Sequence, residues 1–500
     1  MRFTQSLIIA AAACSALACD RQLEPATSNA SSLESAAGFV TGQPAQARTL
    51  LPQAEVKPII TVGDAIPGQE SDPDPEQRVW APIPDGLGAY QQGGDLVLFA
   101  NHEITSSGVD GKFRNARVSR LVLDPATLTI QGGSYAITGT VEGFLFQRLC
   151  SASCIGQAEG FGTGWFFTGE ESATATDGGM QLAVRADGGE TRKLPWLGRF
   201  AHENYIAVPG FPGKTVLIGT DDTSPAGFGT PLLSELYMYV ADNAAAVLNG
   251  SGKLYVFTSA AVLNAGYLET GHPITGSFVE VTDPATQTPS ALQTKVDGLN
   301  AFKFVRLEDV DYDRGPNGRS DKPAIYFVDT GNINARCGAE PCDLHGSIYR
   351  MELNPSNPLQ GARLVLLARS RGIAAGDWAS PDNISVSRKS LMLQEDPAYA
   401  GFTRAERVWN FKLRQGGALG DATAVVELNT QQLTGVTCSD ALGTCWESSG
   451  IIDASEWLGE GTWLFDVQAH TFPFSYQDGA NTVNVSREGG QLLYLRLPGS

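Results

Sequence analysis

Acidic residues recur at the ends of short apolar runs along this sequence. They are Glu103, Glu170 and Glu171, Glu203, Glu308 and Asp309, Asp382, and Glu395 and Asp396. Carboxylates that are brought close together repel one another unless cations neutralise them. Their hard oxygen atoms suit Ca²⁺, which takes about six to eight such ligands, and a bound cation can polarise a phosphoryl group. A single acid at a strand end is most often a solvated turn residue, so the prediction of a metal site depends on the whole set.

Other kinds of site lack part of their sequence pattern. His102 and His202 each precede a glutamate, but neither has a second histidine four residues further on, so the zinc-protease pattern is incomplete. Residues 250–253 lack the first glycine of a phosphate-binding P-loop. No Gly-x-Ser-x-Gly sequence occurs, which argues against a serine hydrolase of that type.

The elements that must position the acids are predicted to be short strands. Runs such as 96–100, 216–219 and 324–328 are rich in β-branched or aromatic residues and are bounded by Gly, Pro, Asp or Asn. Four times, a strand that ends in polar residues is followed by a strand with an aromatic residue near its start, as in 215–222 and 235–240. The pattern predicts an all-β fold, a β-propeller with long loop insertions, whose equivalent strand ends converge on a central channel. A pair of β-sandwiches is the alternative.

The chain carries a strong negative charge. Its 500 residues have a formal net charge of −19 at pH 7 and an isoelectric point near 4.7. Such a surface repels the phosphate backbones of DNA and RNA, so we expect no nucleic-acid partner. It is compatible with the binding of divalent cations. The 42% hydrophobic content is ample for a large buried core.

The N-terminal residues have the features of an export signal. Residues 1–19 contain an apolar stretch too short to span a bilayer and end in Ala16-Leu-Ala-Cys19, which resembles a bacterial lipobox. We expect a lipid anchor at Cys19; a plain secretory signal cleaved nearby is the alternative. Residues 20–56 have the composition of a flexible linker, and 57–500 are expected to form one folded domain. The predicted location is the periplasm or cell surface, with membrane contact through the anchor only.

Six further cysteines form three close pairs. The pairs are Cys150 and Cys154, Cys337 and Cys342, and Cys438 and Cys445. A zinc site would need more histidines or cysteines nearby, and only His345 lies close to any pair. In an exported protein we therefore expect three local disulfides, with zinc binding as the alternative.

Several of these segments resemble motifs of the PhoX-type calcium-dependent alkaline phosphatases. The similar segments are 101–103 (Asn-His-Glu), 168–171, 198–203, 219–222, 306–308 (Arg-Leu-Glu), 380–383 (Ser-Pro-Asp-Asn), 395–396 and 461–470. They occur in the family's order between about residues 90 and 470, so the resemblance covers nearly the whole predicted domain.

The resemblance implies a six-bladed propeller that holds calcium ions and a pair of ferric ions in its channel and hydrolyses phosphomonoesters. The metal ligands implied are Glu171, Glu203, Glu308, Glu395, Asp382 and Asp396. His102, Arg199 and Arg306 are the implied catalytic residues. Either arginine could hold phosphate, because a guanidinium group matches the geometry of phosphate. Either arginine has the alternative of pairing with a carboxylate.

One position departs from the family pattern. Family members carry a cysteine just before the Glu-Glu pair, whose thiolate bridges the irons, and this chain has Gly169 there. Glycine has no side chain to bind a metal, so the sequence favours Ca²⁺ and argues against Fe³⁺. We expect an exported metal-dependent hydrolase that acts on small phosphate monoesters. The alternative is a non-enzymatic calcium-binding surface lipoprotein whose propeller binds a ligand or partner.

Overall fold

The computed structural model describes residues 38–498, except 175, 225–231, 316–321, 333–335, 338–339 and 398–400. Strands dominate the described part of the chain. The α-helices found there are short: α1 (Ala244–Leu248), α2 (Pro289–Gly298), α3 (Thr430–Thr434) and α4 (Ser455–Leu458). None of the described helices is long and apolar enough to cross a membrane.

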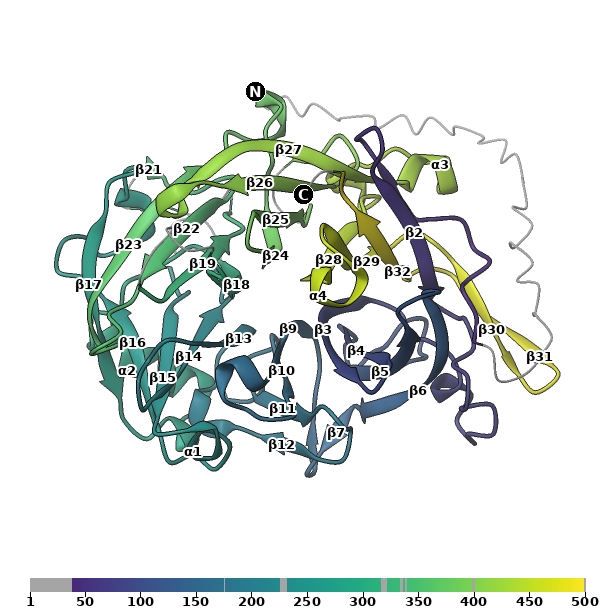
Figure 1. The fold of residues 1–500 in the computed structure, drawn as a ribbon, viewed down its shortest axis with the longest axis horizontal. Coiled ribbons are helices and arrows are strands. Elements are labelled where there is room, and N and C mark those ends of the chain that lie inside the picture. The colour runs from purple at the N-terminus through teal and green to yellow at the C-terminus, as the bar shows by residue number, and fades with distance from the viewer. Residues whose placement is uncertain are drawn as a thin grey trace, which may run out of the picture.

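Six strands surround a central channel. They are β3 (Pro84–Gln92), β9 (Leu149–Ile155), β13 (His202–Val208), β18 (Leu307–Tyr312), β24 (Pro381–Val386) and β28 (Glu447–Asp453). Each packs against the next, and β28 packs against β3, so that the ring closes (Figure 1). This arrangement is a β-propeller, as the sequence predicts.

Antiparallel strands extend outward from each of these six. The sheets are β3-β4-β5-β6, β9-β10-β11-β12, β13-β14-β15-β16-β17-β23-β22-β19-β18, β24-β25-β26-β27-β1 and β28-β29-β32-β2. Dividing the nine-stranded sheet where β17 pairs with β23 gives six radial units. The outer bounds are β1 (Ala47–Thr49), β2 (Glu55–Thr61), β4 (Asp95–His102), β5 (Arg117–Asp124), β6 (Thr129–Thr138), β10 (Trp165–Glu170), β11 (Gln181–Arg185), β12 (Thr191–Lys193), β14 (Thr215–Asp221), β15 (Leu236–Ala241), β16 (Lys253–Thr258), β17 (Ile274–Val281), β19 (Ala324–Asp329), β22 (Ser347–Glu352), β23 (Gln360–Arg369), β25 (Ser390–Glu395), β26 (Arg407–Leu413), β27 (Leu419–Leu428), β29 (Thr462–Ala469) and β32 (Gly489–Arg496).

Short two-stranded ribbons form part of the long insertions between these strands. They are β7 (Thr140–Val141) with β8 (Phe144–Leu145), β20 (Arg336–Cys337) with β21 (Glu340–Pro341), and β30 (Phe474–Asp478) with β31 (Asn481–Val485). The β30–β31 hairpin projects from the last sheet at the edge of the molecule (Figure 1).

Two N-terminal strands complete the last two sheets. β1 pairs with β27 through Ala47 and Leu428, and β2 pairs with β32 through Glu55 and Arg496. Residues 38–56 therefore belong partly to the folded body, and the predicted linker boundary at residue 57 is too late. The sequence could not reveal this, because the partners of the short strand β1 lie some 380 residues away. The predicted signal at 1–19 and the first part of the linker lie outside the described residues.

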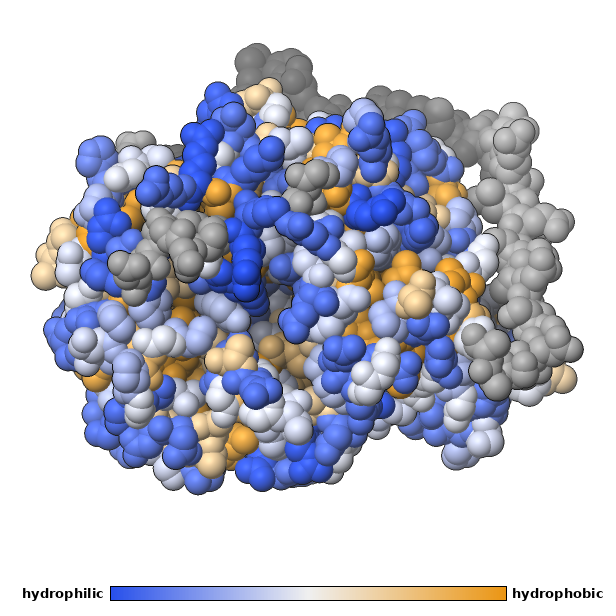
Figure 2. All heavy atoms as spheres, viewed as in Figure 1, coloured by the Kyte–Doolittle hydropathy of each residue, from blue (hydrophilic) through white to orange (hydrophobic). Residues whose placement is uncertain are grey.

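The core is divided among the contacts between neighbouring sheets. Strand residues alternate between two faces, and in the inner strands both faces are covered. Between the first two sheets, for example, Phe99 of β4 stacks on Phe166 of β10 with ring centroids 5.1 Å apart. The outer surface is largely hydrophilic around a hollow near the centre of the face shown in Figure 2.

The cysteines follow the prediction only in part. Cys438 and Cys445 form a disulfide. Cys342 is also disulfide-bonded, and the side chain of Cys337, its predicted partner, lies outside the described part. The predicted Cys150–Cys154 bond is wrong, because both thiols are free. The two residues stand four apart in the extended strand β9, which separates them by roughly 13 Å, far beyond disulfide reach.

Candidate functional site

An acid or a thiol stands at the start of every inner strand. It occupies the second position of five strands and the first of β28: Asp85, Cys150, Glu203, Glu308, Asp382 and Glu447. All six side chains are buried. The pairing register of β3, β13, β18, β24 and β28 shifts within the first few residues of each strand. Such β-bulges re-aim side chains, and here they accompany a ring of donors at one end of the channel.

A second set of acids follows the neighbouring strands. Glu103 comes directly after β4, Glu171 after β10, Asp222 after β14 and Asp396 after β25. Glu103, Glu171 and Asp396 line a cavity of about 320 Å³ together with members of the first ring. A larger cavity of about 1090 Å³ lies at the opposite end of the channel, where the inner strands end. The acids therefore mark one mouth of the channel.

Three groups of these side chains are arranged closely enough to hold a cation. The groups are Asp85, Glu103 and Cys150; Cys150, Glu171 and Glu203; and Glu203, Glu308 and Asp382. Within each group the ligand atoms lie within 4.8 Å of one another. Cys150 and Glu203 each belong to two groups, so the three groups form one continuous array.

The array carries more negative charge than a buried site tolerates without compensation. Burial raises the pKa of Glu203 to about 8, and the negative charge of Asp222 adds to the shift. Burial and neighbouring acids also raise the pKa values of Asp85, Glu308 and Asp382 well above their usual range. A bound cation would lower these pKa values, so the carboxyl groups would release protons as the cation binds.

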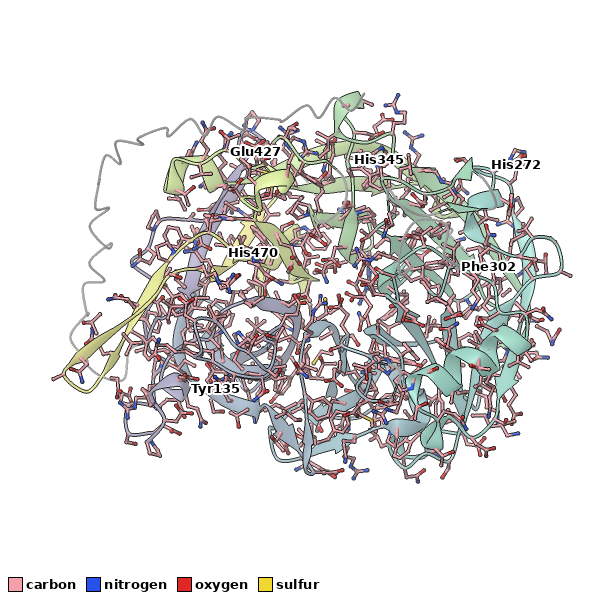
Figure 3. The ribbon with its side chains drawn as sticks, turned by 180° about the vertical axis from the view of Figure 1, so that it is seen from behind. Tyr135, His272, Phe302, His345, Glu427 and His470 are labelled. Atoms are coloured by element: carbon pink, nitrogen blue, oxygen red, sulfur yellow. A yellow bond between two sulfur atoms is a disulfide. The ribbon has the colours of Figure 1, made fainter. Side chains whose placement is uncertain are left out.

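Three basic side chains adjoin the array. Arg306 donates to both oxygens of Asp222, at 2.8 and 2.7 Å, and lies 3.1 Å from Glu308. Arg148 pairs with Glu103 and Glu171, each at 2.7 Å. His470 lies between Glu447 and Glu488 and nearer the channel than the peripheral His272 (Figure 3). Burial alone would lower the pKa of His470, but the hydrogen bond with Glu488 and the nearby Glu447 carboxylate raise it well above its usual range.

Comparison with known families decides the family. The family described as "Alkaline phosphatase PhoX" matches residues 185–451, which is more than half of the chain. The chain belongs to the PhoX family. None of the curated proteins compared with it matches.

The solved structure of Pseudomonas fluorescens PhoX, in complex with the transition-state analogue vanadate, is similar to this PhoX-family chain in fold. The two share 13% identity, with 92% of this chain and 97% of that chain covered and a TM-score of 0.63. A Penicillium chrysogenum α-L-arabinanase in complex with arabinobiose is more distant, with 12% identity, 89% and 99% coverage and a TM-score of 0.43. At 13% identity the likeness to the Pseudomonas fluorescens structure concerns the fold alone.

The donor array fits the metal ions that the PhoX family implies. Glu203 Oε2 and Asp382 Oδ1 are buried and accept no hydrogen bond from any described residue. Buried polar atoms normally have partners, so a cation would satisfy both. Carboxylate oxygens suit Ca²⁺. Cys150 adds one sulfur atom, a softer ligand that suits iron.

Most of the predicted ligands reach the array. Glu171, Glu203, Glu308 and Asp382 lie in its donor groups, and Arg306 and Asp396 line the same cavity. Glu395 does not: its carboxylate accepts from Arg404, Trp409 and two backbone N–H groups. Adjacent strand residues point to opposite faces. Asp396 therefore faces the channel, while Glu395 points away from it, toward Arg404 and Trp409.

The alternation of side chains along a strand also directs His102 away from the channel. Its ring is buried against Pro82 O and Ser119 Oγ at 3.1 and 3.0 Å, and burial lowers the pKa of His102 to about 3. The next residue, Glu103, faces the channel instead. Arg199 is excluded for another reason: it binds Gly178 O and the exposed Asp177, away from the cavity. The predicted catalytic roles of His102 and Arg199 are therefore corrected.

Gly169 offers no thiol, but a cysteine from another strand lies among the donor groups. A Cβ atom added at Gly169 would lie 2.3 Å from His202 Cβ and 2.5 Å from Gln181 Oε1, so a cysteine has no room there. Cys150 Sγ lies 3.5 Å from both Asp85 Oδ2 and Glu203 Oε1. Sequence analysis missed Cys150 because its spacing to Cys154 was interpreted as a disulfide. Asp85 was missed because it precedes its apolar run, whereas the sequence analysis looked for acids that come after such a run.

A network of hydrogen bonds through Ser151, Asn383 and Gly450, here called the belt, supports the array. Ser151 donates to Glu203 Oε1 and accepts from Asn383 Nδ2, while Gly450 N donates to Asn383 Oδ1 at 3.0 Å. The belt thus joins β9, β13, β24 and β28. Partners of this kind orient metal ligands and strengthen binding.

Ser151→Ala is expected to weaken cation binding by about 10-fold, because Glu203 loses the hydroxyl that orients it. Ser153→Ala is the matched control: Ser153 lies on the same strand and donates to Tyr205 O at 2.6 Å, away from the array. Calcium titration by calorimetry measures both variants. Equal affinities for the two variants would contradict the orienting role.

Proposed function

We propose that this PhoX-family chain is a metal-dependent hydrolase of small phosphate monoesters. The observation that carries the proposal is the continuous array of donor groups beside a cavity of about 320 Å³. A carboxylate array of this density serves no packing purpose, since buried charges are unfavourable unless they are paired or bind metals. Family membership supports the same reaction class.

The residues of the chain divide the work as follows. Glu171, Glu203, Glu308 and Asp382 would hold Ca²⁺, together with Asp85 and Glu103. Bound cations would supply Lewis-acid polarisation of the phosphoryl oxygens. Arg306 presents a guanidinium group, fixed by Asp222, to the cavity. The dianionic phosphate ester is then attracted to a mouth whose own acids are neutralised.

Cys150 restores iron as a candidate cofactor. Its sulfur belongs to two donor groups, and Cys150 would supply Fe³⁺ with the thiolate ligand that Gly169 cannot offer. Export to an oxidising compartment is part of the proposal, and the Cys438–Cys445 disulfide supports it. A lipid anchor at Cys19 would then be the only membrane attachment.

A phosphomonoester assay with parallel elemental analysis tests the function. We expect hydrolysis that EDTA abolishes and added Ca²⁺ restores, with iron present in fixed proportion to protein if Cys150 binds it. Calcium-dependent stabilisation without hydrolysis of any small phosphomonoester would favour the alternative, a binding protein. Full activity in EDTA, with no bound metal, would contradict the proposal.

A further inference from the structure

Arg148 and Arg306 occupy equivalent places in two parts of the propeller. Arg306 directly precedes β18 and stands two residues before Glu308, and Arg148 directly precedes β9 and stands two residues before Cys150. Both are followed by leucine, in Arg-Leu-Glu and Arg-Leu-Cys. The carbonyl of each accepts from the residue that follows the next strand, Thr330 N at 3.0 Å and Glu171 N at 2.9 Å.

The backbone of Arg148 is strained. Its φ angle is 49°, a left-handed conformation that is uncommon outside glycine. Residues held in such conformations cluster at functional sites, where surrounding contacts maintain them. Here the contacts are the hydrogen bonds of Arg148 N to Ile104 O, at 3.1 Å, and of Glu171 N to Arg148 O.

The side chain of Arg148 is both anchored and open to solvent. Nε donates to Glu103 at 2.7 Å and Nη2 pairs with Glu171. Nη1 donates no hydrogen bond to any residue in the described part of the chain, and the side chain is 43% exposed where it lines the 320 Å³ cavity. Arg306, in contrast, is 9% exposed and holds Asp222 with two nitrogens.

We propose that Arg148 is a substrate-binding residue that holds the phosphoryl oxygens of the monoester through its exposed guanidinium edge. The assignment rests on the proposed function. A guanidinium group forms short, charge-assisted hydrogen bonds to phosphate and matches its geometry. Arg148 and Arg306 then contact the phosphoryl group from two sides of the mouth, and Glu103 and Glu171 fix Arg148 in place.

Binding of inorganic phosphate to the calcium-loaded full chain tests the role without relying on activity. Arg148→Gln is expected to weaken phosphate binding by about 10- to 100-fold, and Arg148→Lys by a smaller factor, because lysine keeps the charge but loses the fork. KM for a phosphomonoester should rise in both variants. Arg199→Gln, which changes an arginine outside the cavity, is the matched control and should bind phosphate like the wild type.

The outcomes separate this role from a structural one and from the proposed function. If Arg148 only pairs with Glu103 and Glu171, then Arg148→Lys will keep the phosphate affinity of the wild type, and the assignment is overturned. Wild-type protein that binds phosphate without hydrolysing monoesters would contradict the enzyme, while loss of that binding in the variants would still uphold Arg148. Wild-type protein that binds no phosphate would overturn both.

Discussion

Glu203→Gln is expected to reduce turnover of a phosphomonoester by at least about 100-fold. Glu203 belongs to two of the three donor groups, so its replacement removes one ligand charge from both. Loss of about 3 kcal/mol of Lewis-acid stabilisation corresponds to roughly a hundredfold lower rate. The change nearly conserves shape, and the hydroxyl of Ser151 can still donate to the amide oxygen. Steady-state kinetics and elemental analysis of the purified variant measure the effect, and metal content should fall with activity.

Glu170→Gln provides the matched control for this variant. Glu170 is as buried as Glu203, and burial likewise raises its pKa to about 8. Its carboxylate accepts from Gln147 N at 3.0 Å and belongs to no donor group among the described residues. The Glu170→Gln variant should therefore keep its metal content and its activity. Equal losses in the two variants would mean that buried charge, and not metal ligation, determines activity.

Removal of divalent cations is expected to destabilise the protein more at pH 9 than at pH 6. Without cations, Glu203 keeps its proton up to about pH 8, whereas the unfolded chain loses it near 4.5. The folded state binds the extra proton across this window, so the free energy of unfolding falls as pH rises, by about 1.4 kcal/mol per pH unit for each such group. Asp85, Glu308 and Asp382, whose pKa values are also raised, add to the same trend.

Calcium should remove most of this pH dependence. Bound Ca²⁺ replaces the protons and keeps the acids ionised, and it stabilises the folded state by about 2.7 kcal/mol per site at a hundredfold excess over Kd. Thermal melting in EDTA and in CaCl₂ at pH 6 and pH 9 measures the difference. The cation argument fails if, at each pH, the melting temperature in EDTA equals the melting temperature in CaCl₂.

The fold was largely predictable because its signals are local. Runs such as 324–328 are short, β-branched or aromatic, and bounded by turn residues, so strands were identified without knowledge of their partners. The pairing of the N-terminal strands was not local. β1 has three residues and pairs with β27 at the far end of the chain, and a strand this short has no recognisable pattern of its own.

The candidate site was predictable as a set of acids but not residue by residue. The sequence by itself determined that carboxylates adjoin the ends of several strands, with Glu171, Glu203, Glu308 and Asp382 among them. The structure places Glu171 directly after β10 and the other three at the second position of inner strands. Only the tertiary structure decided which of two neighbours faces the channel. Glu395 and Asp396 differ by one position, and strand parity sends them to opposite sides.

Tertiary structure also decided which sulfur reaches the array. The sequence has glycine at 169 and two cysteines that are spaced like a local disulfide pair. The extended conformation of β9 keeps Cys154 away from Cys150, and the packing of successive inner strands brings β3 and β13 to either side of β9. Cys150 therefore meets Asp85 and Glu203, residues 65 and 53 positions away, through contacts that no local pattern encodes.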